Sequence, residues 1–260
     1  MVARVTFTVE NGRMSPRILH VVTNAAHFDD PSEETGLWLS ELTHAWEVFE
    51  RHGFGQTIVS PAGGYVPLDP RSLKFPAREK TAESWLADPE KMALLGDTPR
   101  AADVDAADYD AIWFAGGHGA MYDFPDDADL QRIARGIFEA GGVVSAVCHG
   151  YCGLLNTRLS DGSLLLDGRE ITGFSWREEK LALVDKLVPY DVEEQSRERG
   201  ASYRKAALPF APFTVTDGTL VTGQNPASAK GTAERVAEVL DALGSQGFDE
   251  TPPSAPPTHQ

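Results

Sequence analysis

Cys148 and His149 are the residues of this sequence best suited to covalent chemistry. They follow the apolar run Val143–Val147 and precede Gly150. A buried strand that turns sharply into a helix is the arrangement of a nucleophile elbow, which presents a reactive side chain above a sheet. A thiol at the N-terminus of a helix is also favoured as thiolate by the helix dipole. The pattern predicts a nucleophilic cysteine, and a buried structural thiol is the alternative.

A carboxyl group that could assist this nucleophile lies far upstream, at Glu41. The residues from Gly36 to His52 have the spacing of an amphipathic helix, and Glu41 falls inside its apolar arc, between Val48 and Ala45. A buried carboxyl either finds a partner or stays protonated. Such a group can hydrogen-bond a thiolate and transfer protons. The alternative is a glutamate that reaches solvent from the edge of the arc.

The loop Gly116–Gly119, which contains His118, is the third candidate element. It follows the apolar run Tyr109–Phe114, and its glycines let backbone N–H groups approach a developing negative charge. The loop therefore suits an oxyanion hole beside Cys148. The histidine spacing matches no standard zinc pattern, so we predict no metal site. Cys152 is expected to pack, although it could trap an oxidised thiol.

Short apolar strands alternate with helices along the chain. Strands are predicted at Ile18–Thr23, Ile58–Ser60, Tyr109–Phe114, Val143–Val147, Leu164–Leu166, Glu170–Thr172, Phe213–Val215 and Thr219–Val221. Helices are predicted at Gly36–His52, Thr81–Leu95, Asp127–Ala140 and from Asn225-Pro226 to about Leu243. This alternation indicates an α/β fold, with a mostly parallel sheet covered by helices on both faces. Sites in such sheets form at the carboxyl ends of strands, where Gly116 and Cys148 fall.

The composition narrows the possible partners. The 260 residues include 39 Asp and Glu against 23 Lys and Arg, a net charge of −16. Nucleic acids and anionic membranes attract basic surfaces, so neither is expected as the main partner. No apolar run has the length of a membrane span or a signal peptide, so a cytoplasmic location is expected. We predict a single domain at 16–244, an N-terminal extension at 1–15 and a disordered Pro-rich tail at 245–260.

Five motifs occur together in one order. They are Gly36–His44, Gly116–Gly119, Ala146–Gly150, Thr172–Ser175 with Glu178-Glu179, and Thr222–Ser228. In this combination the chain, from about Pro16 to Leu243, resembles the ThiJ/PfpI superfamily, and more narrowly its branch of heat-shock chaperones with glyoxalase III activity. The resemblance implies a flavodoxin-like sandwich shared with class I glutamine amidotransferases. Two positions depart from the pattern: Tyr151-Cys152 stands where Pro-Ala is usual, and Trp176 is bulky.

The same resemblance implies a set of site residues. Cys148 would be the nucleophile, His149 its neighbour and Glu41 the carboxyl that contacts the thiol. The backbone amides of Gly117 and His149 would form the oxyanion hole. The third acidic member would be Glu178, and Glu179 is the alternative because the local spacing fits both.

The activity implied by the resemblance is that of a cofactor-independent glyoxalase III, which converts methylglyoxal to lactate without glutathione. The partner is then a small reactive aldehyde, and glycated proteins, unfolded proteins and a second copy in a homodimer are further candidates. A cysteine-dependent amidase or hydrolase, a holdase chaperone and a redox sensor are the alternatives. A glutaminase is disfavoured because its triad uses a late His-x-Glu, whereas the only histidine after His149 is His259.

Overall fold

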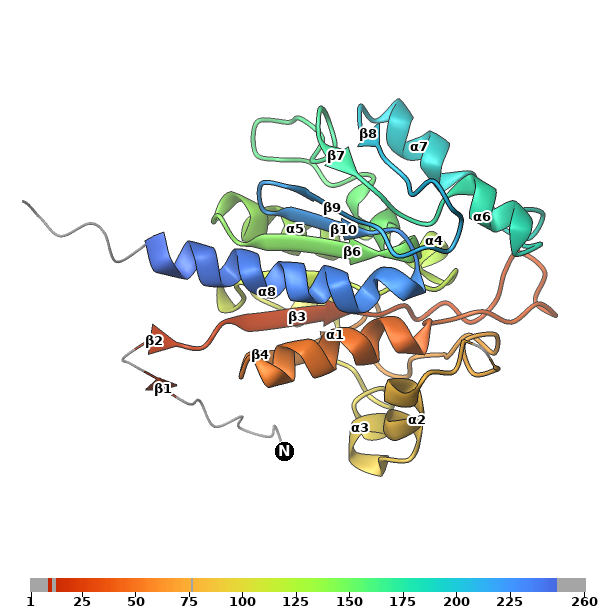
Figure 1. Cartoon of the computed structure of the whole chain (residues 1–260), viewed down its shortest axis with the longest axis horizontal. Coiled ribbons are helices and arrows are strands. Elements are labelled where there is room, and N and C mark those ends of the chain that lie inside the picture. Colours follow the sequence, from red (N-terminus) through yellow and green to blue (C-terminus); the bar gives the residue numbers. More distant parts are fainter. Residues whose placement is uncertain (1–8, 11–12, 76, 247–260) are drawn as a thin grey trace, which may run out of the picture.

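A six-stranded sheet forms the centre of the computed structural model, which describes residues 9–10, 13–75 and 77–246 (Figure 1). Five neighbouring strands are parallel, and the last one pairs antiparallel with its neighbour. In sheet order the strands are β4 (Gly55–Val59), β3 (Arg17–Val21), β5 (Ala111–Phe114), β6 (Val143–Val147), β10 (Leu220–Gly223) and β9 (Thr214–Asp217). The parallel strands end at one edge of the sheet, so the chemistry expected after β5 and β6 gathers there.

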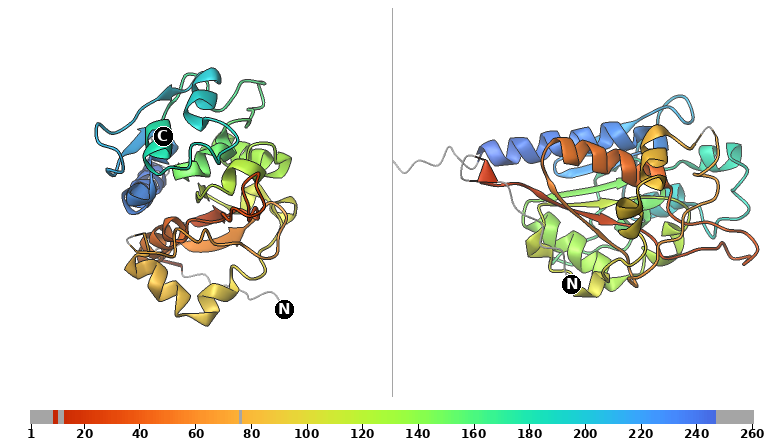
Figure 2. Two further views of the ribbon diagram at one scale, coloured as in Figure 1. Left: turned by 90° about the vertical axis from the view of Figure 1, so that its right-hand side faces the viewer. Right: turned by 90° about the horizontal axis from the view of Figure 1, so that it is seen from below.

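Helices cover both faces of this sheet. The right-hand view of Figure 2 shows α1 and α8 running side by side along one face, with α5 on the other. The helices are α1 (Leu39–Arg51), α2 (Lys80–Leu86), α3 (Pro89–Ala93), α4 (Ala120–Asp123), α5 (Ala128–Glu139), α6 (Trp176–Leu181), α7 (Val192–Glu198) and α8 (Ala229–Gln246). The predicted α/β class, mostly parallel and covered on both faces, is therefore confirmed.

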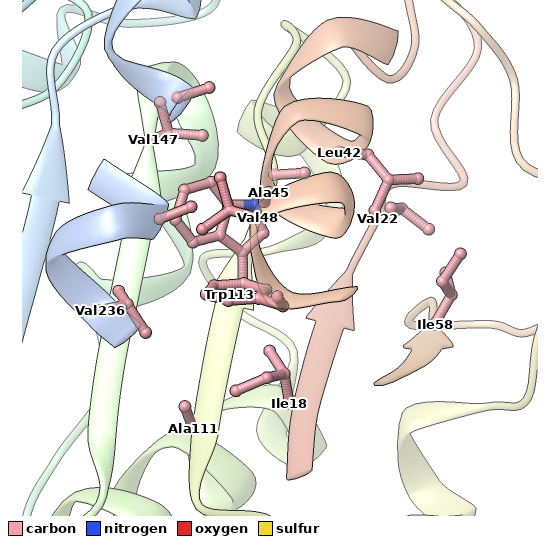
Figure 3. Packing of buried hydrophobic residues seen from close by; sticks show 14 of the residues in the cluster. Ile18, Val22, Leu42, Ala45, Val48, Ile58, Ala111, Trp113, Val147 and Val236 are labelled. Carbon is pink, nitrogen blue, oxygen red and sulfur yellow. The ribbon is translucent and has the colours of Figure 1, made fainter. Parts of the chain in front are cut away.

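The strands alternate their side chains between two hydrophobic cores, as a pleated strand must. On β5, Ala111 and Trp113 join the core under α1 and α8, whereas Ile112 and Phe114 join the core under α5. Figure 3 shows Trp113 between the sheet and Val48 of α1. Both strand faces are buried, which is why these strands are apolar throughout rather than alternating apolar and polar.

The remaining elements are short. The strands β1 (Val9–Glu10) and β2 (Arg13–Met14) pair with each other, as do β7 (Glu170–Ile171) and β8 (Ser202–Tyr203). Four segments form 3-10 helices: Ala101–Asp103, Ala106–Asp108, Cys148–Leu154 and Pro226–Ser228. Within the described ranges, no helix combines the length and apolar character needed to cross a membrane.

Two element predictions were wrong. The helix predicted at Thr81–Leu95 is two helices, because Asp88 caps a new helix that starts at Pro89. The strand predicted at Leu164–Leu166 is a turn-rich segment, whose apolar residues Leu165 and Leu166 are buried under the sheet. A short apolar run fills a core equally well in either conformation, so its composition did not decide between them. Of the predicted tail, residues 247–260 lie outside the described residues, and 245–246 end α8.

Candidate active site

Cys148 occupies the turn between β6 and the 3-10 helix Cys148–Leu154. Its φ is +53°, a left-handed conformation that a side chain normally avoids and that concentrates at functional positions. The side chain is 2% exposed. The predicted turn from strand to nucleophile is present, although the helix that follows is 3-10 rather than α.

Glu41 lies in the first turn of α1 and is fully buried, as the helical pattern predicted. Its Oε2 accepts a hydrogen bond of 2.7 Å from the backbone N–H of Gly116. Its Oε1 has no hydrogen-bond partner of ordinary geometry among the described residues, although the carboxyl interacts with the Cys148 thiol. Burial raises the pKa of Glu41 to about 8. The carboxyl is therefore able to hold or release a proton near neutral pH, which suits acid–base work.

The Cys148 thiol is protonated in the resting site. Burial, followed by the nearby Glu41 carboxyl, raises the pKa of Cys148 well above its ordinary value. The helix N-terminus was expected to favour the thiolate. Burial outweighs this effect, because the dipole of a seven-residue 3-10 helix stabilises a thiolate by less than desolvation destabilises it. The nucleophile must be generated by moving its proton to a neighbour.

His149 is the neighbour that can take this proton. Its Nδ1 lies 3.3 Å from Cys148 Sγ, and its Nε2 lies 2.5 Å from Oε1 of Glu179. All three side chains are buried. Burial alone would raise the pKa of Glu179, but His149 and His118 outweigh it and keep that pKa below its ordinary value. A carboxylate at Nε2 leaves Nδ1 of the neutral ring free to accept the thiol proton.

A second histidine fixes the protonation pattern around Glu179. Arg71 donates a hydrogen bond from Nη2 to Nδ1 of His118 (3.0 Å), and Nε2 of His118 lies 3.1 Å from Oε2 of Glu179. An arginine donates but never accepts, so the proton of a neutral His118 must be on Nε2. Burial, and next the neighbouring His149, lowers the pKa of His118 to about 4, so this ring is neutral. Glu179 therefore accepts one N–H from each histidine.

The position of Arg71 is fixed by an ion pair. Its guanidinium pairs with the fully buried Asp69, which also accepts a 3.0 Å hydrogen bond from Thr35. A chain of hydrogen bonds thus runs from Asp69 through Arg71 and His118 to Glu179.

Glu178, the first choice for the third acidic member, lies in a different environment from its neighbour. It forms a capping box with Ser175 at the start of α6. Its two oxygens also accept hydrogen bonds from the backbone N–H of Phe210 and from the side-chain amides of Gln224 and Asn225. The alternative, Glu179, is therefore the residue that lies against His149. Glu178 instead holds the loops around α6 together through its hydrogen bonds.

Two glycines allow these parts to meet. A Cβ at Gly116 would lie 2.7 Å from Oε2 of Glu41 and 2.8 Å from the backbone nitrogen of His149. Gly117 has a φ of +105°, and a Cβ there would lie 2.1 Å from the carbonyl oxygen of Gly36. The loop after β5 thus lies directly against the elbow. The backbone N–H groups of Gly117 and His149, the predicted oxyanion hole, belong to these two adjoining segments.

A cavity of about 180 Å³ opens onto the nucleophile. Its lining includes Cys148 and His149, and further side chains from separate segments of the chain: Trp38, Arg71, His118, Phe174, Val184 and Phe210. The wall is largely apolar and aromatic, which excludes water and strengthens electrostatic interactions within it. Its size suits a compound of a few heavy atoms.

His118, His149 and Glu179 also form a cluster of side chains that could hold a metal ion. Their ligand atoms lie within 4.8 Å of one another, and all three are buried. In this structure those atoms are hydrogen-bonded among themselves. An ion bound there would have to replace these hydrogen bonds.

Two residues of the cavity wall, Arg71 and Phe210, had no signal in the sequence, because they come from irregular segments where no periodicity marks a direction. Trp38 and Phe174 lie within two of the five motifs, but the sequence did not indicate that they line the cavity. His118 was visible only as a member of a glycine-rich loop. Tyr151, the departure from the usual pattern, is fully buried and donates a hydrogen bond to the carbonyl oxygen of Phe174, so it supports the cavity wall.

Several known proteins are similar to this chain in sequence and fold over most of their length. A glutathione-independent glyoxalase of Saccharomyces cerevisiae is 34% identical over 222 residues, covering 82% of this chain and 92% of that protein. The structure of Rapid Encystment Protein 24 KDa from Francisella tularensis superposes with a TM-score of 0.82 at 35% identity, covering 86% of this chain and 99% of that one.

Glyoxalase III from Candida albicans gives a TM-score of 0.79 at 32% identity, covering 86% of this chain and 97% of that one. The model of the DJ-1/PfpI family matches residues 34–238, a range that includes Glu41, Cys148, His149 and Glu179. The resemblance carried by the five sequence motifs is therefore confirmed, and the chain belongs to the DJ-1/PfpI family.

Proposed function

We propose that this chain is a glutathione-independent glyoxalase that converts methylglyoxal to lactate, with Cys148 as nucleophile. The observation that carries the proposal is the convergence of two proton carriers on one buried thiol, His149 with its Glu179 and Glu41 with its pKa of about 8. Hydrolysis of a substrate by a cysteine nucleophile needs only one proton carrier, His149 with Glu179. Moving a proton between two carbons needs a second, and the similarity to glutathione-independent glyoxalases supports the same reading.

The first step generates and uses the thiolate. Nδ1 of His149 takes the proton of Cys148, and Glu179 stabilises the imidazolium that forms. The thiolate attacks the aldehyde carbon, a C–S bond forms, and the carbonyl π electrons move to oxygen. The backbone N–H groups of Gly117 and His149 stabilise this oxyanion, which becomes a hemithioacetal when the imidazolium returns the proton.

The second step moves a proton from the former aldehyde carbon to the ketone carbon. Glu41, as carboxylate, removes the C1 proton, and the C–H electrons form a C1–C2 double bond while the ketone π electrons move to the second oxygen. The protonated Glu41 then returns its proton to C2. The C1 hydroxyl gives its proton to the second oxygen as the C1 carbonyl reforms, and a lactyl thioester of Cys148 results. A pKa of about 8 makes both forms of Glu41 available near neutral pH.

Water completes the reaction. It attacks the thioester carbonyl with His149 as base, the C–S bond breaks, and the thiol regains its proton from the ring. Methylglyoxal and one water are consumed, and one lactate is formed, so no external oxidant or reductant takes part. Glutathione is not needed because Cys148 supplies the thiol.

The other candidate functions have less support. A redox sensor needs an accessible thiolate, whereas Cys148 is buried and its pKa is raised. Amide hydrolysis would use His149 and Glu179 but leaves Glu41 without a task. A cavity of about 180 Å³ favours a small aldehyde over a protein segment. Action on glycated or unfolded proteins, a homodimer and a cytoplasmic location stay predictions.

The test is lactate formation from methylglyoxal by the purified protein in the absence of glutathione. Wild type should form lactate, and Cys148→Ala should form none. Thermal unfolding of Cys148→Ala should still show the cooperative transition of a folded protein. Cys152→Ala is the matched control, because it removes the other free buried thiol, one helical turn along, and should keep turnover. A wild type that forms no lactate overturns the proposal, and aggregation suppression that survives Cys148→Ala would instead favour a holdase.

A further inference from the structure

Two hydrogen-bond donors line the cavity without a partner among the described residues. Trp38 lines the cavity, and its buried indole Nε1–H donates to no described residue. The guanidinium of Arg71 uses Nε and Nη2 for Asp69 and His118, and its Nη1 takes part in no hydrogen bond within the described chain. A buried N–H left without an acceptor costs about 1–3 kcal/mol, so a site that keeps one is suited to a ligand that supplies the acceptor.

The charge of the cavity points to the same kind of ligand. Among its described lining residues, Arg71 is the sole Lys, Arg, Asp or Glu, and His118 beside it is neutral with a pKa lowered to about 4 by burial and next by His149. The rest of the polar lining is Cys148 and His149, which belong to the reacting centre. Asp69 balances the charge of Arg71 from outside the cavity, so what Arg71 offers on the cavity side is a charged N–H donor in a largely apolar wall, which favours a ligand that has, or develops, negative charge on an oxygen.

We propose that Trp38 Nε1–H and Arg71 Nη1 form a second oxygen site and are the residues by which this cavity recognises the ketone oxygen of its substrate. The aldehyde oxygen lies in the oxyanion hole, and the oxygen of the adjacent carbonyl accepts from Trp38 and Arg71. This inference rests on the proposed function and adds two specificity-determining residues to it. When the C1 proton leaves, the ketone π electrons move to this second oxygen, and Arg71 faces the enediolate charge directly.

A monocarbonyl such as propanal tests the idea because it differs from methylglyoxal only at the second oxygen. Both compounds offer an aldehyde to Cys148, but propanal leaves the two donors unpaired. Sites built to hydrogen-bond an oxygen discriminate strongly against analogues that lack it. Methylglyoxal is also the more electrophilic aldehyde, so the informative quantity is how the preference changes between wild type and a variant that lacks one donor.

The experiment measures reversible binding at Cys148 without requiring turnover. The concentrations of methylglyoxal and of propanal that halve the rate of Cys148 alkylation by iodoacetamide are determined, and their ratio is the preference. Trp38→Phe, which removes the N–H and keeps an aromatic ring, should reduce the preference for methylglyoxal by about fivefold to tenfold, since a neutral hydrogen bond contributes about 1 kcal/mol. Arg71→Met should reduce it by tenfold or more, because its donor is charged.

Trp46→Phe is the matched control, because Trp46 is half-buried on α1 and does not line this cavity, and its preference should equal that of wild type. An effect of Arg71→Met through His118 changes Cys148 reactivity toward both aldehydes and cancels in the ratio. If Trp38→Phe fails to fold, Arg71→Met decides alone.

An unchanged preference in the folded variants overturns the second oxygen site, even if wild type forms lactate. A reduced preference in a protein that forms no lactate upholds the site and rejects the glyoxalase reaction.

Discussion

Replacing Glu179 and Glu178 one at a time tests which of the two carboxyls serves catalysis and which serves stability. Glu179 accepts an N–H from His149 on one oxygen and an N–H from His118 on the other. A glutamine at 179 has a single acceptor oxygen, so its NH2 group must face one ring nitrogen that also carries a proton. One histidine must then change tautomer. If His149 changes, its Nδ1 carries the proton and can no longer accept that of Cys148.

The size of the effect follows from these two hydrogen bonds. A hydrogen bond to a charged group contributes about 1.5–3 kcal/mol, and the amide keeps one of the two acceptor oxygens, so losing the other from the transition state costs about 1.5–3 kcal/mol. At about 1.4 kcal/mol per factor of ten, Glu179→Gln should lower kcat at least about 10–10²-fold.

Glu178→Gln should behave in the opposite way. Its carboxylate accepts from Ser175, Phe210, Gln224 and Asn225, so the amide loses structural bonds worth about 2–4 kcal/mol. At about 2–4 °C per kcal/mol for a domain of this size, Tm should fall by about 5–15 °C. The kcat of the folded fraction should stay within about tenfold of wild type. Lactate formation at 15 °C and thermal unfolding check both variants, and a Glu178→Gln defect in kcat equal to or larger than that of Glu179→Gln refutes the assignment.

Three further predictions concern Glu41, the loop beside it and metal ions. The raised pKa of Glu41 contributes stability that is present below about pH 4.5 and lost as pH rises through about 8, so its contribution to the unfolding free energy should fall by roughly 1.4 kcal/mol per pH unit in between. Urea unfolding at pH 5–8 should show this slope in the difference between wild type and Glu41→Gln, and an equal pH slope in both proteins contradicts the burial argument. Gly116→Ala brings a Cβ within 2.7 Å of the Glu41 carboxyl, so we expect at least a hundredfold loss of kcat with retained folding. A near-normal kcat would show that the loop can shift to accommodate the Cβ and would contradict this prediction. Turnover should survive treatment with EDTA and fall on addition of Zn²⁺, which competes for His118, His149 and Glu179; turnover that EDTA abolishes and Zn²⁺ restores would contradict a metal-independent reaction.

The features that could be predicted from sequence are those encoded by local patterns. Strands buried on both faces appear as apolar runs, which is why β5 and β6 were located within a residue or two. Helical periodicity predicted the burial of Glu41, because it lies inside the apolar arc of the helix. The turn that presents Cys148 was predicted from the order of an apolar strand, a cysteine and a glycine.

The features that escaped prediction depend on how distant segments meet. Glu178 and Glu179 are adjacent on a short helix, about 100° apart, and the direction of each is decided by what packs against α6. Gln224, Asn225 and Phe210, which lie on neighbouring loops, donate hydrogen bonds to Glu178 and so fix its direction. The charge of the cavity likewise comes from Arg71, whose position depends on Asp69 and on the path of an irregular segment.

The central claim is that Cys148 holds the substrate covalently during turnover. Wild type and Glu41→Gln are mixed with methylglyoxal without glutathione, quenched in acid at short times, and the peptide that contains Cys148 is analysed by mass spectrometry. We predict a methylglyoxal-derived adduct on Cys148 that rises and decays with lactate formation in wild type and accumulates in Glu41→Gln, since attack by the thiol does not need that carboxyl. Lactate formation with no adduct on Cys148 at any time in either protein would contradict the account.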